Sequence, residues 1–133
     1  MKYVVILTIC LLSACNGWEY PQSADVQRVK NETPVARLSI GDMEGQLQYV
    51  NSVIEVEGVI LHIVNKGGQP GISLGATDVS DKESLGLLLT FDPKERQPIK
   101  KLKVGDTMIF KGILVKAPTC RSPGRIDAAI VQR

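Results

Sequence analysis

The stretch SVIEVEGVILHIV, residues 52–64, constrains the fold more than any other part of this 133-residue chain. Before Gly58, apolar residues alternate with Glu55 and Glu57, as in a strand with one buried face and one wet face. Beyond Gly58, the run is apolar on both faces. A strand that changes pattern at a glycine is typical of a bend that carries it from one sheet into another. The stretch therefore predicts a barrel corner.

Four further strands follow, separated by turn-forming residues. We expect them at residues 72–77, 85–91, 107–116 and 125–133. Between the third and fourth strands of the barrel, Asp92 can cap a helix and Pro93 suits the first helical position. Pro98 limits that helix to a short or broken one.

The last two strands carry two further features. Gly112 interrupts the fourth strand, as Gly58 interrupts the first, and predicts a second bend. In the final strand, Ile126, Ala128 and Ile130 alternate with other residues and should share one face. Five strands with these bends, and a helix between strands three and four, predict an all-β, five-stranded Greek-key OB-fold barrel over residues 47–133.

Two segments also resemble a known family. VIEVEGVI (53–60) and LKVGDTMIFKGIL (102–114) resemble the paired signature of the tRNA_anti-like group of OB-fold proteins, many of which look like small bacterial lipoproteins. The resemblance covers about residues 47–131, roughly two-thirds of the chain, and implies the barrel fold. The chain departs from the group in having no cysteine at the end of its last strand. The family name implies no tRNA binding here.

The start of the chain predicts export. Val4–Leu12 is an uninterrupted apolar run of nine residues, whereas a membrane-spanning helix needs roughly 20. Leu12-Ser13-Ala14-Cys15 then resembles a bacterial lipobox. The resemblance implies that residues 1–14 are a cleaved signal peptide, that the Cys15 thiol is diacylglycerated, and that the new amine is acylated, for example by palmitate. The alternative is an ordinary secretory peptide in which Cys15 is incidental.

The predicted anchor also gives a location. Several acyl chains, at about 0.8 kcal/mol per buried methylene, hold a protein on a bilayer almost irreversibly. Asn16 follows the cysteine where an aspartate would signal inner-membrane retention, so the resemblance favours the periplasmic side of the outer membrane. Residues 16–37 are mostly polar, with two prolines and no sustained period. We therefore expect residues 15–46 to be the lipid attachment site and a flexible tether.

The cysteine and histidine content bounds the chemistry. With Cys10 removed and Cys15 lipidated, only Cys120 keeps a free thiol, so no internal disulfide can form. Cys120 lies in the turn-rich stretch APTCRSPG, where a reactive or intermolecular thiol and a merely tolerated one both stay open. His62 is the only histidine. One cysteine and one histidine cannot build a metal site, and we expect neither metal nor cofactor.

Charge is distributed unevenly along the chain. From Lys94 to Arg133 there are ten basic and three acidic residues, and five of the basic ones cluster closely: Lys94, Arg96, Lys100, Lys101 and Lys103. Such a basic face could meet acidic lipid head groups, lipopolysaccharide phosphates or an acidic protein partner. The alternative is a solvated surface whose charges only keep the domain soluble.

Single-stranded nucleic-acid binding, as in conjugation or DNA uptake, is one hypothesis for the function. OB domains that hold single strands usually stack bases on aromatic side chains of strands two and three. Here those strands offer only Phe91, at the end of the third. Nucleic acid is therefore the alternative and not the first choice.

Catalysis is also disfavoured, because His62 stands in an apolar strand and no partner can be assigned to Glu55 or Glu57. We therefore predict a lipid-anchored, non-catalytic binding or assembly module of the cell envelope. Its partner would be an envelope protein or a surface lipid. Three structural features would distinguish these functions. Stacking residues exposed on strands two and three would favour nucleic acid, and a buried polar pocket around His62 would favour catalysis. A contiguous apolar patch on the outer face of the barrel would favour protein docking.

Overall fold

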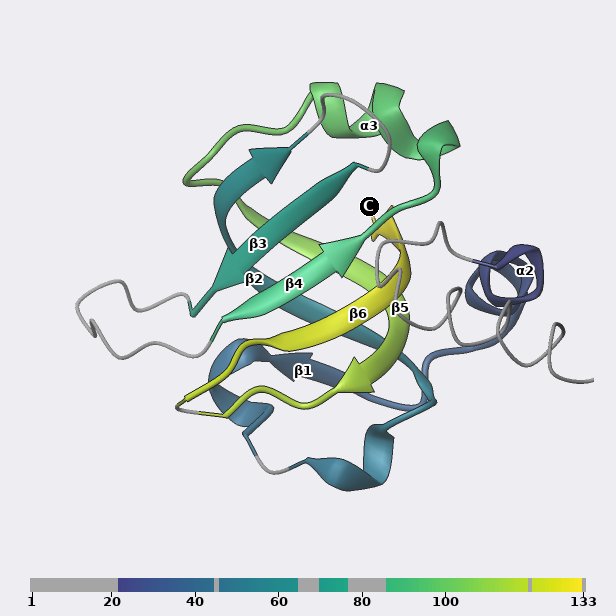
Figure 1. The fold of residues 1–133 in the computed structure, drawn as a ribbon, viewed down its shortest axis with the longest axis vertical. Helices are drawn as coiled ribbons and strands as arrows, with labels where there is room; N and C mark the ends of the chain where they lie inside the picture. The colour runs from purple at the N-terminus through teal and green to yellow at the C-terminus, as the bar shows by residue number, and fades with distance from the viewer. Residues whose placement is uncertain (1–21, 45, 65–69, 77–85, 120, 133) are drawn as a thin grey trace, which may run out of the picture.

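The computed structural model of the chain describes residues 22–44, 46–64, 70–76, 86–119 and 121–132. The strands are β1 (Arg37–Ser39), β2 (Val53–Val64), β3 (Gly71–Gly75), β4 (Leu87–Thr90), β5 (Thr107–Lys116) and β6 (Gly124–Gln132). The α-helices are α2 (Ser23–Asn31) and α3 (Arg96–Lys100) (Figure 1). Short 3-10 turns are η1 (Ile40–Asp42), η2 (Leu47–Tyr49) and η3 (Pro93–Glu95).

Five strands close into a barrel. Their order is β2-β3-β4-β6-β5, and β5 pairs back onto β2, while β1 adds to β2 in parallel from outside the closed ring. Strand β2 is long enough to serve two neighbours: Val53–Val59 pairs with β5 and Val59–Val64 pairs with β3. The predicted five-stranded barrel, with a short helix between its third and fourth strands, is confirmed.

Gly58 lies where β2 passes from one neighbour to the other. A Cβ at this position would stand 2.7 Å from Ile40 Cδ1 and 2.9 Å from the carbonyl oxygen of Gly75. A side chain would therefore push apart β3 and the η1 turn that covers the end of the barrel. The predicted glycine corner in this strand is confirmed.

A β-bulge interrupts the pairing of β5 with β6. Lys111 pairs with Ile130 and Ile113 pairs with Asp127, so two residues of β6, Ala128 and Ala129, lie opposite Gly112 alone. Ala128 takes a positive φ of 54°, and Gly112 provides room for the extra residue.

The bulge changes which residues of β6 share a face. Ile126 belongs to the barrel interior, whereas Ala128 and Ile130 pack outside it, against α2. The expectation that Ile126, Ala128 and Ile130 share one face is therefore wrong, because an extra residue in a strand reverses the alternation that follows it.

Two apolar clusters hold the domain together. The larger fills the barrel interior and includes Phe91 and Phe110, whose rings meet edge to face with centroids 5.9 Å apart. The smaller lies between α2 and the barrel wall and contains Val26, Val29, Val53, Ile113 and Ala128. The second cluster makes α2 part of the folded unit.

Residues 23–44 thus differ from the tether predicted for residues 15–46. Val29 of α2 is fully buried, the Arg28 Nη2 atom donates to the Asn51 carbonyl at 3.1 Å, and β1 pairs with β2. Ile40 and Met43 are buried in the interior cluster. Within the described residues, this segment therefore packs on the barrel, because a few apolar side chains in a polar stretch contact apolar side chains of the barrel. Residues 1–21, including Cys15, lie outside the described residues, and the signal-peptide boundary stays a prediction.

The helical segments follow the sequence signals. The Asp92 carboxylate accepts a hydrogen bond of 3.0 Å from the Lys94 amide at the start of η3, and Pro93 is its first residue. The segment is broken, as expected, into η3 and a one-turn α3 that contains Pro98. None of the helices in the described part of the chain has the length and apolar character needed to cross a membrane.

Candidate binding face on the outside of the barrel

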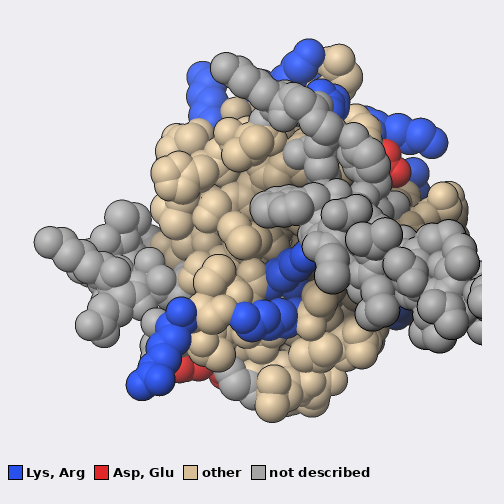
Figure 2. Space-filling view, viewed as in Figure 1, with Lys and Arg blue, Asp and Glu red and all other residues tan. Residues whose placement is uncertain are grey.

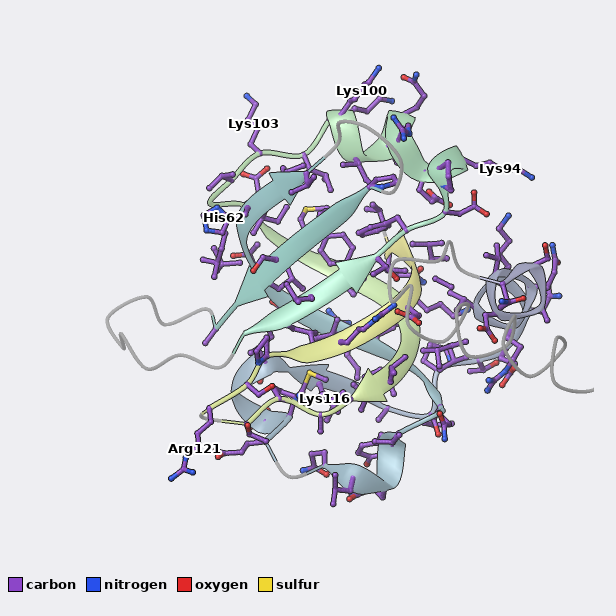
Figure 3. All side chains as sticks on the ribbon, viewed as in Figure 1. His62, Lys94, Lys100, Lys103, Lys116 and Arg121 are labelled. Carbon is purple, nitrogen blue, oxygen red and sulfur yellow. The ribbon has the colours of Figure 1, made fainter. Side chains whose placement is uncertain are left out.

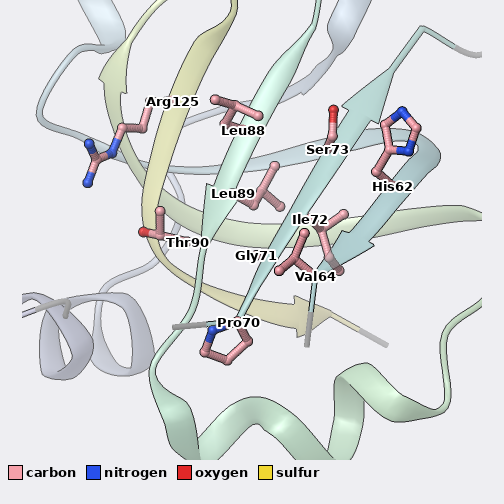
Figure 4. A pocket seen from close by; sticks show the side chains of 10 residues that line it. All are labelled: His62, Val64, Pro70, Gly71, Ile72, Ser73, Leu88, Leu89, Thr90 and Arg125. Carbon is pink, nitrogen blue, oxygen red and sulfur yellow. The ribbon is translucent and has the colours of Figure 1, made fainter. Parts of the chain in front are cut away.

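Strand pairing aligns four side chains in one row across the outer face of the barrel. His62 of β2 is the Cα partner of Ser73 on β3, and Ser73 is the partner of Leu88 on β4. Leu88 is in turn the partner of Arg125 on β6. Directly paired residues point to the same side of a sheet, so these four project together (Figure 4).

A second row lies beside the first. Val64 of β2 pairs with Gly71 of β3, and Gly71 pairs with Thr90 of β4. Because Gly71 has no side chain, the face is hollow between Val64 and Thr90. The two rows together bring residues from positions 62 to 125 onto one surface.

These rows line a pocket with a volume of about 400 Å³. Most of its lining is apolar: Val64 and Leu88 are 57% and 45% exposed, while Ile72 and Leu89 are buried. Large exposed side chains of this kind, gathered on one concave surface, are typical of ligand or partner sites. The full lining is His62, Val64, Pro70, Gly71, Ile72, Ser73, Leu88, Leu89, Thr90 and Arg125.

A hydrogen-bonded group fixes one edge of the pocket. The Arg125 Nε atom donates to Asp127 Oδ1 at 2.7 Å, and the Thr90 hydroxyl donates to the same oxygen at 2.9 Å. Asp127 therefore orients the guanidinium through Nε. The structure shows no protein partner for the Nη atoms of Arg125 among the described residues. Those atoms can bind a carbonyl or carboxylate of a ligand.

His62 stands at the opposite end of the first row, exposed on the rim of the pocket. No hydrogen bond joins its ring to the Ser73 hydroxyl. The pocket that His62 lines is mostly apolar. Within the described ranges, no three His, Cys, Asp or Glu side chains gather as a metal site would require.

Solved structures share this architecture. The chain is similar to OBody AM3L09, seen bound to hen egg-white lysozyme, with 14% identity, 76% of this chain and 98% of that chain covered, and a TM-score of 0.52. It is also similar to a Leishmania major Friedlin protein proposed to be an aspartyl-tRNA synthetase, with 12% identity, 86% and 23% coverage, and a TM-score of 0.51. The fold is an OB barrel.

A third structure is a protein of Klebsiella pneumoniae subsp. pneumoniae MGH 78578, proposed to be a nucleic acid-binding lipoprotein. It matches with 19% identity over 65% of this chain and 74% of that chain, at a TM-score of 0.49. No family model and no curated protein sequence matches the chain. Membership of the tRNA_anti-like group therefore stays a prediction.

In an OB barrel the second and third strands form the surface on which many of these proteins bind ligands. Here those strands are β3 and β4, which contribute six of the ten pocket residues. Phe91 and Phe110 are buried in the interior, and Tyr49 packs against the same cluster. None of the described aromatic side chains is therefore offered for stacking on this face.

The five basic residues singled out from sequence lie elsewhere. Lys94, Arg96, Lys100, Lys101 and Lys103 belong to η3, α3 and the following turn, at one end of the barrel, and none of them lines the pocket (Figure 3). Figure 2 shows the same separation, with neutral surface over β3 and β4 and Lys and Arg side chains mainly around its margins.

Sequence reasoning missed Ser73, Thr90 and Arg125 as residues of a site. Each occupies an outward position of its strand, and alternation alone could have marked it as outward. What the sequence did not supply was the register that places them next to His62 and Leu88.

Proposed function

We propose that this chain is a non-catalytic binding module of a bacterial envelope, which holds an apolar segment of a partner protein in the pocket of its OB barrel. The observation that carries the proposal is the contiguous apolar pocket on the outer face of β2, β3, β4 and β6. Protein sites that bind small or extended ligands are usually mostly apolar, with a few placed polar groups. This pocket has that composition.

The chemistry of the lining favours a peptide over other ligands. Val64 and Leu88 offer apolar contact, while the Ser73 hydroxyl and the Arg125 Nη atoms can bond the carbonyls of an extended main chain. A barrel of similar fold, OBody AM3L09, is bound to a protein, hen egg-white lysozyme. The OB architecture is therefore compatible with a protein ligand.

The proposed lipid on Cys15 would place the pocket near a membrane. Gln22, the first described residue, is seven positions after Cys15, so the intervening chain can reach at most about 25 Å. A barrel held this close to a bilayer meets membrane partners at a high effective concentration. Asn16 supports the outer membrane, on its periplasmic side, as the proposed location.

Site-specific photo-crosslinking in the native envelope tests the proposal. A photo-reactive amino acid at Leu88 should capture one reproducible protein, and the same probe at the exposed Leu47 should not, because Leu47 lies outside the pocket. With a probe at Ser73 instead, the variant Leu88→Glu should lose that capture, whereas Leu47→Glu should keep it. Equal capture from positions 88 and 47, or capture that survives Leu88→Glu, would contradict the proposal.

Single-stranded nucleic acid is the second candidate, and one observation favours it. Arg125 is the Cα partner of Lys116 on β5, so the row of pocket residues continues into two cations. Such a row of cations could contact a phosphate backbone, although this face has no aromatic platform among the described residues. Binding of an oligonucleotide that weakens steeply with salt, and is reduced by Lys116→Glu, would favour this function over peptide binding.

A further inference from the structure

The end of the barrel formed by η3, α3 and the turn into β5 carries a second surface, which we call the basic pole. It consists of Lys94, Lys100, Lys101, Lys103 and Val104. All four lysines are exposed, and Val104 is 62% exposed. The pole is separate from the pocket, because none of its residues lines the pocket.

The turn that carries Val104 is held firmly. The Gly105 amide donates to the Ile60 carbonyl at 2.8 Å, and the Ile60 amide donates to the Asp106 carbonyl at 2.9 Å. The Asp106 amide donates to the Lys103 carbonyl at 3.1 Å, and Gly105 supplies the positive φ of 96° that the turn requires. The exposed side chain of Val104 is thus carried at the tip of a well-held turn, directly after Lys103 in the chain.

The charge of the pole is not cancelled by ion pairs. None of its four lysines forms a salt bridge among the described residues. Two nearby acids contact backbone amides: the Asp92 carboxylate accepts from the Lys94 amide, and the Asp106 carboxylate accepts from the Lys103 amide. From position 92 to position 106 the chain has five basic and three acidic residues, so this end keeps a net positive charge. Glu95 is partly buried and interacts electrostatically with Lys30 of α2.

We propose that the basic pole docks on anionic lipid head groups of a bilayer, with Val104 entering the interface. Lysines near an anionic surface are attracted to it, and an exposed apolar side chain at the same end of the barrel can leave water for the interface. The inference rests on the proposed lipid on Cys15, which would keep the barrel within reach of the bilayer. Docking by this end would orient the barrel and leave the pocket on its side open to a partner.

The test uses the mature protein purified from its membranes and reconstituted into phosphatidylcholine vesicles, with or without phosphatidylglycerol. A fluorescent amino acid replaces Val104 or, as a matched control, Arg121 at the opposite end of the barrel (Figure 3). Lipids with a nitroxide on the head group quench the probe when it touches the surface. At low salt we expect quenching at position 104 that requires phosphatidylglycerol, and little quenching at position 121.

Charge reversal identifies the residues responsible. Lys100→Glu, Lys101→Glu and Lys103→Glu together should lower the ratio of docked to undocked barrel by at least about 100-fold, because the loss of each cation costs on the order of fivefold near an anionic surface and each new carboxylate is repelled by it. Lys116→Glu with Arg121→Glu, at the other end, should leave that ratio unchanged. Circular dichroism confirms that each variant is folded. If both sets of changes have the same effect, the docking proposal is wrong.

Other outcomes separate the docking from the anchor. Quenching at position 104 that is equal with and without phosphatidylglycerol, or equal to that at position 121, would contradict the docking. A single-stranded oligonucleotide that changes the signal at position 104 when phosphatidylglycerol does not would assign the pole to nucleic acid instead. Release of the whole protein from the vesicles at high salt would contradict the lipid on Cys15, while the low-salt quenching decides the docking independently.

Discussion

Gly112 of β5 lies opposite the bulged residue Ala128 of β6, and the two positions depend on each other. The bulge gives β6 one residue more than its partner at this point, and the missing side chain of Gly112 makes the space for it. As a result, Ile126 of β6 faces the barrel interior, whereas Ala128 of the same strand packs against the helix α2. One glycine thus lets a single strand serve both apolar clusters.

The first prediction concerns this glycine. Gly112→Ala should lower the free energy of unfolding by about 2 kcal/mol, because the new Cβ would overlap Ile126 Cγ2 and stand 3.1 Å from the carbonyl oxygen of Asp127. Urea unfolding measures the change. Gly41→Ala is the matched control, since no atom lies within 4 Å of its Cβ position, and it should change stability by less than about 0.5 kcal/mol. Equal effects would mean that the bulge is absent in solution.

The sequence predicted the barrel because its signals are local. A glycine inside an alternating strand marked the corner at Gly58, and Asp92 with Pro93 marked the start of the helical segment. Such features need no knowledge of distant residues. The bulge in β6 was not predictable in the same way, because Ala128 carries no local signal and its positive φ is imposed by the register of β5 against β6.

The sequence patterns also did not predict that the segment before the barrel packs against it. In α2 only Val26 and Val29 are buried, and two apolar residues in a polar stretch are compatible with a tether as well as with a short helix. The pocket could not be predicted from the sequence for a related reason. Leu88 and Arg125 become neighbours only through the parallel pairing of β4 with β6, which connects positions far apart in the chain.

The second prediction tests the packing of α2. Val29→Ala should lower the free energy of unfolding by about 2 kcal/mol, because the side chain is fully buried against the barrel wall and its loss leaves a cavity. Val35→Ala removes the same atoms from a side chain that is 62% exposed, and should cost less than about 0.5 kcal/mol. Matching values for both variants would show that residues 23–31 do not pack on the barrel.

The third prediction concerns pH. Burial raises the pKa of Glu95 above its usual 4.5, Lys30 opposes this shift, and Asp92 adds to it. The folded protein therefore holds this proton more tightly than the unfolded chain does. Protonated Glu95 favours folding at low pH, and that contribution is lost as pH rises from the unfolded-state pKa through the folded-state pKa.

Glu95→Gln should remove this loss. Its free energy of unfolding, relative to the original protein, should increase as the pH is raised from acid to neutral, as urea unfolding at a series of pH values would show. Glu44→Gln, at an exposed position, controls for the removal of one negative charge. A difference between the Glu95 variant and the original protein that is constant across the series, or that falls with pH, would contradict burial of this carboxyl group.

The last prediction concerns the two cysteines at the start of the chain. If Cys15 is lipidated, the mature protein should begin at this residue and carry the added mass of its acyl chains in mass spectrometry. Cys15→Ser should leave the protein without lipid and released from membranes by a salt wash. Cys10→Ser is the matched control, because it changes a thiol within the predicted signal peptide and should leave processing and lipid unchanged. A native protein that retains Met1 and has an unmodified thiol at position 15 would remove the anchor, and with it the reason to place this OB barrel at a membrane surface.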